Sequence, residues 1–404
     1  MRGNVITGML RGGLSFGAGS VISGEFNVSI TPEQCIAIGA AAAGSGRVGV
    51  SCGGGEGASV TADALCCGVR SAGGEAVLLD CAFPACAAFS AKSFALGISI
   101  FVCGRGENIE LMFFGEDGLP LGRDMQRKIE SSVSGGAVRA TAEKAGRIAS
   151  VSGTAAAYLA AAAESVSHAE KMPEVRVCGT GGANRTLRRA LSKTGCRVEE
   201  NGGGVPAFEI TDGGFGLIAY DEDGRRYDRE WVLVMTALCE FEHGSGVVAV
   251  PYGAPGSLDI LASSLGTHVL RLERDGKRAE ELYKSQIFLR DGVFAALKLC
   301  NAMALSGERL ASIAARIPPF FITTREVNVA CGRAKAMRLL TNAYSETASE
   351  IFDGLRVDTG HGIIRVHPGH EPGRLIVTGE ATREEIAEEL CADFAGRAEK
   401  LTDE

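Results

Sequence analysis

The sequence predicts an α/β protein of four domains, in which three α/β domains with mixed sheets precede a smaller C-terminal α+β domain. Two observations support this fold class. A β-branched strand, a glycine-rich turn, a helix and a second strand recur three times along the chain. Beyond about residue 323 the pattern changes to several short strands with two helices. At 404 residues the chain is also too long for one hydrophobic core.

The first repeat lies in the predicted first domain, residues 1–136. Residues 47–52 form a β-branched strand, a glycine-rich turn follows, residues 60–69 have helical spacing, and residues 75–80 form the next strand. Such a βαβ unit needs a right-handed crossover between parallel strands. We therefore expect parallel strands at the centre of this domain.

Two further repeats define the predicted second and third domains, residues 137–243 and 244–320. The second repeat has strands at 175–179 and 196–199 around a helix over 184–194. The third has strands at 246–251 and 267–272 around a helix over 257–264. The alanine-rich segment 141–168 is expected to be one long helix that joins the first repeat to the second.

The fourth predicted domain, residues 321–404, has a different order of elements. A strand at 325–329 precedes a helix over 333–350, and a charged helix begins after Thr382. The sequence Thr-Arg-Glu-Glu at 382–385 fits a helix N-terminus with acidic residues in its first turn. Three strands between these helices, at 354–357, 363–366 and 374–378, predict a mostly antiparallel sheet.

The composition excludes several classes of function. The 49 Asp and Glu residues outnumber the 41 Lys and Arg residues, and the resulting net charge of −8 argues against a surface for nucleic acid or an anionic membrane. Because there is no run of eighteen apolar residues and no signal peptide at the N-terminus, we expect a cytoplasmic protein. The 13 cysteines include no Cys-x-x-Cys pair, so we interpret them as buried thiols rather than as disulfides or zinc ligands.

Several segments resemble the α-D-phosphohexomutases, enzymes that move phosphate between the 1 and 6 positions of hexoses. They are Phe16–Gly24, Ile30–Glu33, Gly68–Gly73, Phe114–Leu121 and, near the C-terminus, Pro368, Gly369, Glu371 and Pro372. The resemblance extends over nearly the whole chain. It implies the family's architecture of three α/β domains followed by an α+β domain.

Catalysis in this family, as the resemblance implies, depends on one reactive part in each domain. A phosphoserine donates the phosphoryl group, three aspartates hold Mg²⁺, a Glu-x-Ser loop binds sugar hydroxyls, and a loop of the fourth domain binds the second phosphate. Because phosphoryl transfer depends on positioning and charge stabilisation, losing the metal or the phosphate loop would remove most of the rate.

The first of these parts is altered in this chain. Against the family's phosphoserine loop, Cys103 replaces the serine and Gly104 replaces the histidine. Cys103 is the candidate catalytic residue, because a thiol can carry a phosphoryl group, but its sequence neighbours offer one arginine and no base, so an incidental cysteine is the alternative. The turn Gly53–Gly55 has lost both arginines of the family and fits either a phosphate cradle or a plain connection.

The second and third parts are altered as well. Where the family has three aspartates, residues 211–216 keep only Asp212, a vestigial metal ligand. One carboxylate cannot hold Mg²⁺ against water unless substrate phosphates complete the site, so we expect no cofactor, or Mg²⁺ only with residual mutase activity. The sugar-binding motif is missing, and residues 280–286 have the composition of a charged surface helix.

The fourth part keeps some of its pattern. In the loop 367–374, histidines replace an arginine and a threonine of the family, and we predict phosphate binding by His367, Gly369, His370 and Arg374. A transition-metal site formed by His361, His367, His370 and Glu371 is one alternative. A solvated loop without a ligand is the other.

The replaced residues lie at the reactive loops, whereas the turns and helices between them match the family. Our leading hypothesis is therefore a pseudoenzyme with a binding, regulatory or assembly role. The expected partners are a hexose phosphate or another small anion, an active mutase paralogue, or a second copy of the chain, but no nucleic acid and no membrane. The alternatives are an active phosphotransferase on hexose phosphates, another phospho-ligand enzyme with altered catalytic residues, and an oligomer without a ligand.

Overall fold

The computed structural model describes residues 15–166, 171–200, 202–329, 331, 333–344, 348–351, 354–369 and 373–403. The chain divides into two compact units. The first contains the chain up to Ser165 together with Cys178–Lys193 and Ile210–Gly216, and the second contains the other segments. The described strands form four sheets, and each sheet takes its strands from one contiguous part of the chain. This arrangement confirms the predicted fold class.

The first unit is built on a six-stranded mixed sheet with the strand order β1-β5-β4-β2-β3-β6. β2 is parallel to β3 and β4, and β3 is parallel to β6, whereas β5 is antiparallel to β1 and β4. The central strands carry buried β-branched residues, as expected for strands covered on both faces. The strands are β1 (Val21–Glu25), β2 (Arg47–Gly53), β3 (Glu75–Leu79), β4 (Ile98–Arg105), β5 (Asn108–Gly115) and β6 (Ile148–Val151).

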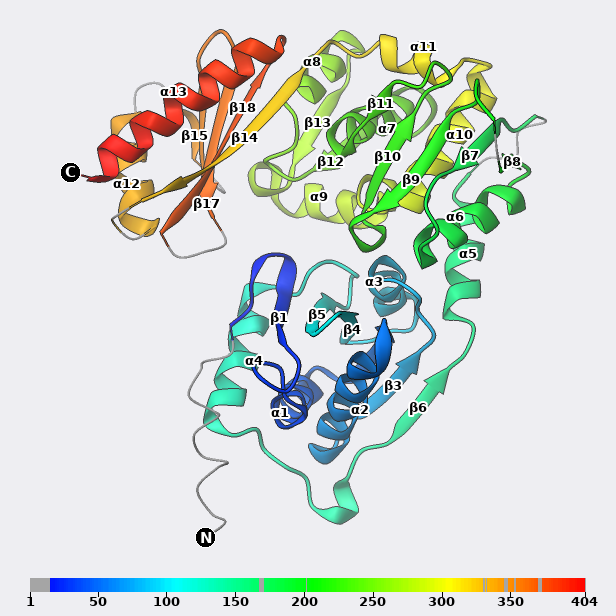
Figure 1. Ribbon diagram of the computed structural model, residues 1–404, viewed down its shortest axis with the longest axis vertical. Coiled ribbons are helices and arrows are strands. Elements are labelled where there is room, and N and C mark those ends of the chain that lie inside the picture. Colours follow the sequence, from blue (N-terminus) through cyan, green and yellow to red (C-terminus); the bar gives the residue numbers. More distant parts are fainter. Residues whose placement is uncertain are drawn as a thin grey trace. The chain divides into compact units, whose positions relative to one another are not determined.

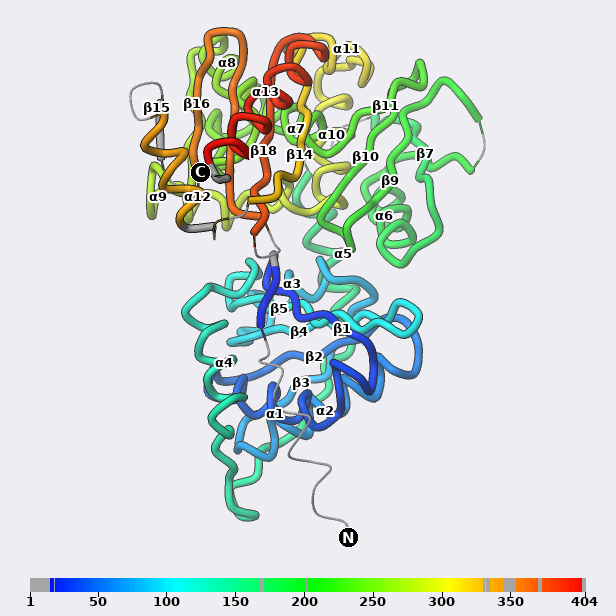
Figure 2. The backbone as a smooth tube through the Cα atoms, turned by 60° about the vertical axis from the view of Figure 1, so that its left-hand side comes forward, coloured from blue at the N-terminus to red at the C-terminus, as the bar shows by residue number. Residues whose placement is uncertain are grey.

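Helices cover both faces of this sheet. In Figures 1 and 2, α1 and α2 lie on one face and α3 lies on the other. α1 begins at Pro32 because Thr31 and Gln34 form a capping box, in which each side chain accepts from the backbone N–H of the other residue. α1 and α2 approach closely at Gly68, where a Cβ would overlap the carbonyl oxygen of Ile36. The helices are α1 (Pro32–Ala42), α2 (Gly55–Ser71), α3 (Pro84–Ser93), α4 (Arg123–Gly135), α5 (Thr154–Glu164) and α6 (Gly182–Lys193).

The prediction of one long helix over residues 141–168 is wrong, because a strand, β6, precedes the helix α5. Gly146 donates its N–H to the carbonyl oxygen of Arg70 at 2.8 Å, and β6 then pairs in parallel with β3. Gly153, in the left-handed region with a φ of 91°, turns the chain into α5. Pairing with the sheet therefore outweighs the helix propensity of the alanines.

The second unit contains most of the next sheet and the whole of the third one. In the order β11-β10-β9-β7-β8, β7 is parallel to β8 and β9 while β10 is antiparallel to β11, so this sheet is mixed. The third sheet has two described strands, β12 and β13, and they are parallel rather than mixed. The strands are β7 (Glu174–Val177), β8 (Arg197–Glu199), β9 (Ala207–Thr211), β10 (Gly216–Tyr220), β11 (Arg226–Tyr227), β12 (Val247–Val250) and β13 (His268–Arg271).

The helix α10 is largely buried, and it packs against α7 and α11. The carboxylate of Asp291 caps α10 by accepting from the backbone N–H groups of Val293 and Phe294. The helices are α7 (Arg229–His243), α8 (Ser257–Ser264), α9 (Leu272–Ser285), α10 (Gly292–Ser306) and α11 (Leu310–Ala315). In the part of the chain that the structure describes, no helix has both the length and the apolar character needed to cross a membrane.

The C-terminal domain of the second unit has an antiparallel sheet in the order β14-β18-β17-β16-β15. Figure 1 shows α13 lying along this sheet. The predicted helix over 333–350 is too long: it ends at Ala343, and β15 pairs with the edge of β16 instead, which satisfies the backbone groups of that edge. The elements are β14 (Phe321–Asn328), α12 (Arg333–Ala343), β15 (Ala348–Ile351), β16 (Leu355–Asp358), β17 (Ile363–Pro368), β18 (Arg374–Ala381) and α13 (Glu384–Asp403).

The two faces of this C-terminal sheet differ in polarity. Ile364 and Val366 of β17 belong to the apolar core that α12 and α13 cover. Because side chains alternate along a strand, their neighbours Arg365 and His367 point to the opposite face. On β18 the same alternation puts Thr378 on that polar face, because its neighbour Val377 is in the core. The polar face is the one that carries the candidate site.

Candidate functional site

Cys103, the predicted catalytic residue, lies within a regular β-hairpin of the first unit. β4 continues through Cys103 to Arg105, and Cys103 pairs with Glu110 of β5 on one side and with Gly53 of β2 on the other. A hydrogen bond with the Cys103 thiol and the charge of Glu110 raise the pKa of Arg105. Nε of Arg105 is 3.8 Å from the Glu110 carboxylate. The strand pairing thus places the Glu110 carboxylate opposite Cys103, which sequence reasoning did not foresee. That carboxylate lies beside the guanidinium of Arg105.

The glycine-rich turn before α2 packs tightly against the same hairpin. Gly54 has a φ of 90°, and a Cβ there would lie 2.7 Å from the carbonyl oxygen of Gly104. A Cβ at Gly104 would in turn overlap the carbonyl oxygen of Gly54. The two backbones can approach this closely only because both residues are glycine. Close packing of β2 and β4 therefore accounts for these glycines without a phosphate ligand.

Asp212 lies in the turn between β9 and β10. This turn packs against the start of α3, because a Cβ at Gly213 would lie 2.7 Å from Cγ of Pro84. Asp212 itself has a φ of 50°, and its carboxylate folds back over Gly216, where a Cβ would lie 2.6 Å from Oδ2. Among the described residues, no three His, Cys, Asp or Glu side chains are grouped so that they could hold a metal ion. The residues of the turn therefore do not fit the oxygen ligand set that Mg²⁺ needs.

The predicted phosphate-binding residues follow one another around the β17–β18 connection. His367 pairs with Ile376 across the sheet, and Gly369 donates its N–H to the carbonyl oxygen of Arg374 at 2.8 Å. The guanidinium of Arg374 donates to the Glu326 carboxylate at 2.6 Å. His370, like Glu371 of the metal alternative, lies outside the described residues. His361 precedes β17 whereas His367 lies near its end, so the strand holds these two histidines apart.

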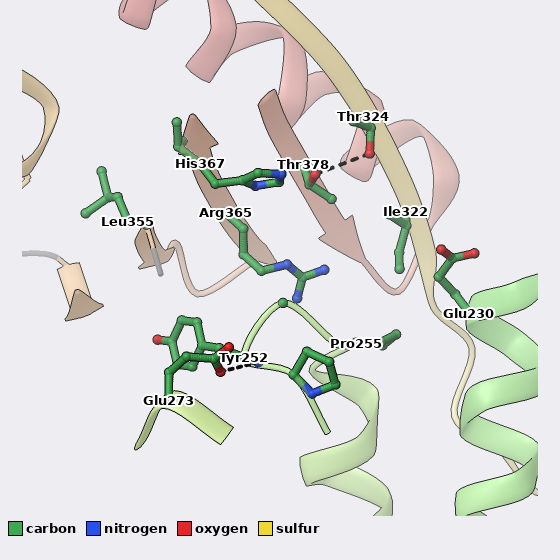
Figure 3. Close-up of a pocket in the computed structure, with 14 residues that line it drawn as sticks. Glu230, Tyr252, Pro255, Glu273, Ile322, Thr324, Leu355, Arg365, His367 and Thr378 are labelled. Carbon is green, nitrogen blue, oxygen red and sulfur yellow. Dashed lines mark hydrogen bonds between the residues drawn. The ribbon is translucent and has the colours of Figure 1, made fainter. Parts of the chain in front are cut away.

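A cavity of about 320 Å³ opens on the polar face of the C-terminal sheet, entirely within the second unit. We call it the Arg365 cavity. Figure 3 shows Arg365, His367 and Thr378 on its sheet wall, opposite Tyr252 and Glu273. Its lining residues come from α7, the β12–α8 loop, α9 and four strands of the C-terminal domain: Glu230, Pro251, Tyr252, Gly253, Pro255, Glu273, Ile322, Thr324, Gly354, Leu355, Arg365, Val366, His367 and Thr378.

The β12–α8 loop, which forms the wall opposite the sheet, is held in place by Arg271. This side chain is fully buried, and its guanidinium donates to the carbonyl oxygens of Tyr252 at 3.0 Å, Ala254 at 2.7 Å and Pro255 at 3.1 Å. It also donates to the carboxylate of Asp259 at 2.5 Å. Burying these carbonyl groups would be unfavourable without such donors. Arg271 therefore fixes the shape of one side of the cavity.

Arg365 and Glu380 form a buried ion pair behind the opposite wall. Nη1 of Arg365 donates to Oε2 of Glu380 at 2.9 Å, and the two side chains are only 8% and 6% exposed. Glu380 also accepts from the backbone N–H groups of Gly256 at 2.9 Å and Ser257 at 3.1 Å, at the start of α8. The carboxylate of Glu380 thus joins the C-terminal sheet to the β12–α8 loop. Its negative charge also interacts favourably with the positive N-terminal end of the α8 dipole.

The guanidinium of Arg365 is buried and has charges of both signs around it. Burial lowers the pKa of Arg365, and the neighbouring charges of Arg271 and Arg356 lower it further, while Glu380 opposes them. Arg356 lies beside the loop, with its guanidinium 6.0 Å from the centre of the Tyr252 ring. Three guanidiniums therefore lie beside the loop that borders the cavity, and the carboxylates of Glu380 and Asp259 compensate the charges of Arg365 and Arg271.

Sequence reasoning named His367, which lines the cavity, but missed Arg365, Glu380 and Arg271; phosphate binding by His367 stays a prediction. A signal for Arg365 was present, because an arginine stands in the apolar run Ile363–Val366 where a strand alternates between its faces. Arg271 and Glu380 gave no such signal, because their roles depend on a loop more than a dozen residues away in the chain. The alternation of apolar and polar residues along the strand would therefore have identified Arg365, but neither Arg271 nor Glu380.

Comparison with known proteins supports the fold directly. The sequence matches no protein-family profile and no curated protein. Among solved structures, a phosphoglucomutase/phosphomannomutase family protein from Burkholderia thailandensis has a TM-score of 0.74 and 16% identity, over 96% of this chain and 97% of that one. The phosphoglucomutase parafusin from Paramecium, in its open form, has a TM-score of 0.62 and 11% identity, over 92% and 91%.

A third structure extends the comparison to another substrate class. An N-acetylglucosamine-phosphate mutase in its product complex, a member of the α-D-phosphohexomutase superfamily, has a TM-score of 0.52 and 9% identity, over 95% of this chain and 96% of that one. Because these likenesses extend over almost the whole length of both chains, the protein has the α-D-phosphohexomutase fold. The fold implied by the sequence resemblance is confirmed.

Proposed function

We propose that this protein uses the phosphohexomutase fold for binding rather than for the mutase reaction, as a pseudoenzyme with a binding or regulatory role. The ligand proposed is a phosphorylated sugar or another small anion. The observation that carries this proposal is the hairpin at Cys103, the position of the family's phosphoserine. A side chain that receives and returns a phosphoryl group needs room for in-line attack and charge stabilisation nearby.

Two features of the hairpin disfavour such a reaction. The backbone of Cys103 pairs with a neighbouring strand on either side, and Gly104 packs directly against Gly54. The turn that carries Asp212 supplies one carboxylate, so the developing charge on a phosphoryl group would lack the metal that the resemblance implies.

A coupled enzyme assay tests the loss of mutase activity. We expect no turnover above background with glucose 1-phosphate, mannose 1-phosphate or glucosamine 6-phosphate, each with Mg²⁺ and a bisphosphate activator. Turnover that Cys103→Ala abolishes would overturn the proposal in favour of an active phosphotransferase with a cysteine nucleophile. Turnover that survives Cys103→Ala and disappears on further purification of both proteins comes from a contaminating host mutase, whereas turnover that persists in both would overturn the proposed loss of activity by a reaction that does not use Cys103.

A regulatory role requires a partner, and an active mutase or a second copy of this chain is the partner proposed. The kcat/KM of a purified active phosphohexomutase, measured with and without an excess of this protein, tests the first possibility. Size-exclusion chromatography with light scattering tests the second. The cytoplasm is the proposed location, because all thirteen cysteines, which lie within the described residues, are free thiols, as expected in a reducing compartment.

A further inference from the structure

We infer that the outer edge of β14 binds an extended protein segment with basic side chains and adds it to the C-terminal sheet as a further strand. The inference goes beyond the proposed function, because a partner can bind at this edge whether or not the mutase reaction is lost. All of the residues concerned belong to the second unit.

β14 lies at one end of its sheet and is exposed along most of its length. Among the described strands it pairs with β18 alone. Of its eight residues, Phe321–Asn328, only Val327 is buried. Because an antiparallel partner uses the backbone groups of every second residue, the N–H and C=O groups of the alternate residues point away from β18. Such an edge is a template for an added strand.

The first half of β14 lacks the features that usually block such an edge. Proteins protect edge strands with charged residues, prolines, bulges or a short length. The run Phe321–Thr324 contains no charge and no proline, and its residue types favour a strand. Its register with β18 has no bulge. Charged residues begin at Arg325 and Glu326, so a partner strand would pair with Phe321–Thr324.

A cavity of about 420 Å³, which we call the β14 groove, follows this half of the strand. Phe321 and Thr323 line it, and they point to the same face of the sheet as Val327 of the core. Ile322 and Thr324 line it as well, and they point to the polar face. Because residues of both faces contribute, the groove runs along the strand edge. Four strand residues span about 10 Å, so a segment of about four residues would match them.

The described residues that line the β14 groove include three carboxylates and no positively charged side chain. Asp228 and Glu230 lie at the start of α7, and Figure 3 shows Glu230 beside Ile322 of β14. Glu384 lies at the start of α13, which covers the other face of the sheet. Arg226 compensates Asp228 in part, at 3.7 Å, whereas neither Glu230 nor Glu384 forms an ion pair with a described residue. This charge pattern complements a basic segment.

The two sides of the groove determine the spacing of the basic residues. Side chains of an added strand alternate between the two faces of the sheet. One side chain would therefore meet Glu230 on the polar face, and the next would meet Glu384 at the start of α13. Two consecutive lysines or arginines fit this arrangement best.

An aromatic pair provides the apolar part of the groove. The rings of Trp231 and Phe320 stack with their centres 4.7 Å apart and 19° between their planes. Phe320 is buried, and Trp231 is partly exposed. Tryptophan is enriched among the residues that contribute most to protein interfaces, and the aliphatic stems of basic side chains can pack against such a ring. The groove therefore fits an extended segment with two consecutive basic residues between β-branched ones.

Fluorescence titration with a synthetic peptide tests the inference. Trp231 is the single tryptophan of the chain, so its emission reports on the β14 groove. We expect the capped peptide Ac-Thr-Val-Lys-Lys-Val-Thr-NH₂ to change this emission saturably, and calorimetry should give the same Kd. The peptide with two glutamates in place of the lysines should bind at least about tenfold more weakly, because the carboxylates would repel it. N-methylation of the four central amides should weaken binding at least about tenfold, because the donors to the strand edge are lost.

Variants of the groove test the assigned residues. Glu230→Gln/Glu384→Gln removes the two carboxylates and should weaken binding of the lysine peptide about five- to tenfold. The matched control is Glu385→Gln: this carboxylate lies in the same first turn of α13, is 77% exposed and does not line the groove. Its affinity should equal that of the unmodified protein. Circular dichroism melts establish that each variant is folded.

Several results would overturn the inference. They are equal affinity for the lysine and glutamate peptides, equal affinity for the N-methylated peptide, unchanged affinity in the folded double variant, and no binding of the lysine peptide by either method. Lysine amide that binds as tightly as the peptide would make the groove a site for small cations instead. A stable dimer that Ile322→Lys separates into monomers would place a second copy of the chain on this edge instead.

This inference and the proposed function can fail separately. The coupled assay reports on the reaction at Cys103, whereas the peptide titration reports on the edge of β14. Turnover with peptide binding would overturn only the loss of mutase activity. No turnover without peptide binding would overturn only the strand addition.

Discussion

The carboxylate of Glu380 is shared by three groups from two parts of the second unit. It accepts from Arg365 on its own sheet and from the first backbone N–H groups of α8. A buried ion pair contributes little net stability, but removal of one partner leaves the other charge buried without compensation. Glu380 is therefore the residue at which a single change should have the largest effect near the cavity.

We expect Glu380→Gln to lower the free energy of unfolding by about 3 kcal/mol, because Arg365 would remain charged and buried. The double variant Arg365→Met/Glu380→Gln should recover most of this loss, since no isolated charge is then left inside. Urea denaturation measures both. Glu326→Gln is the control: its pair with Arg374 is 57% and 40% exposed, and its loss should cost less than about 1 kcal/mol. Equal losses for Glu380→Gln and Glu326→Gln would contradict the assigned role.

At the residue level, the sequence allowed some positions of the site to be predicted and concealed others. His367 could be found because it replaces an arginine in a recognisable loop, and it does line the cavity. Arg271 could not be found, because most of its hydrogen bonds go to backbone carbonyl groups of a loop, and backbone acceptors leave no mark in a sequence. The site therefore depends largely on backbone positions that composition and spacing do not record.

At the level of elements, the three βαβ units could be predicted because their signals are local. Glycine turns between a β-branched run and a helix-periodic run lie within about twenty residues of each other. β6 and β15 were missed because each is an edge strand of four residues that exists through its pairing with another strand. Alanine-rich and mixed sequences of that length carry no strand signal of their own.

The close contact between the β4–β5 hairpin and the turn before α2 gives a prediction at this level. We expect Gly104→Ala to lower the free energy of unfolding by about 2 kcal/mol or more, because the added methyl group would meet the carbonyl oxygen of Gly54. Gly135→Ala, at a helical glycine with no atom within 4 Å of the added Cβ, should change stability by about 1 kcal/mol or less. Thermal and urea unfolding of the two variants should differ clearly. If they do not, the backbones are not in contact.

At the level of the whole molecule, the fold is far better conserved than the sequence. At 16% identity the chain keeps the phosphohexomutase arrangement over 96% of its length, while the sequence resemblance predicts other residues at the family's reactive positions. A fold positions a site but does not define its chemistry, because the chemistry depends on particular side chains. The function must therefore be tested through particular residues. For the whole protein, the most direct test is whether it responds to Mg²⁺.

We expect Mg²⁺ at millimolar concentration to leave the Tm unchanged. A ligand that binds only the folded state raises the Tm by mass action, so a resident Mg²⁺ ion would be visible in a melt. Mg²⁺ demands a nearly octahedral set of oxygens and gives up its water reluctantly, whereas the β9–β10 turn offers the single carboxylate of Asp212. Melts with Mg²⁺ are compared with melts in NaCl of equal ionic strength. A rise in Tm with Mg²⁺ that Asp212→Asn abolishes would contradict the prediction and place a working metal site at this turn.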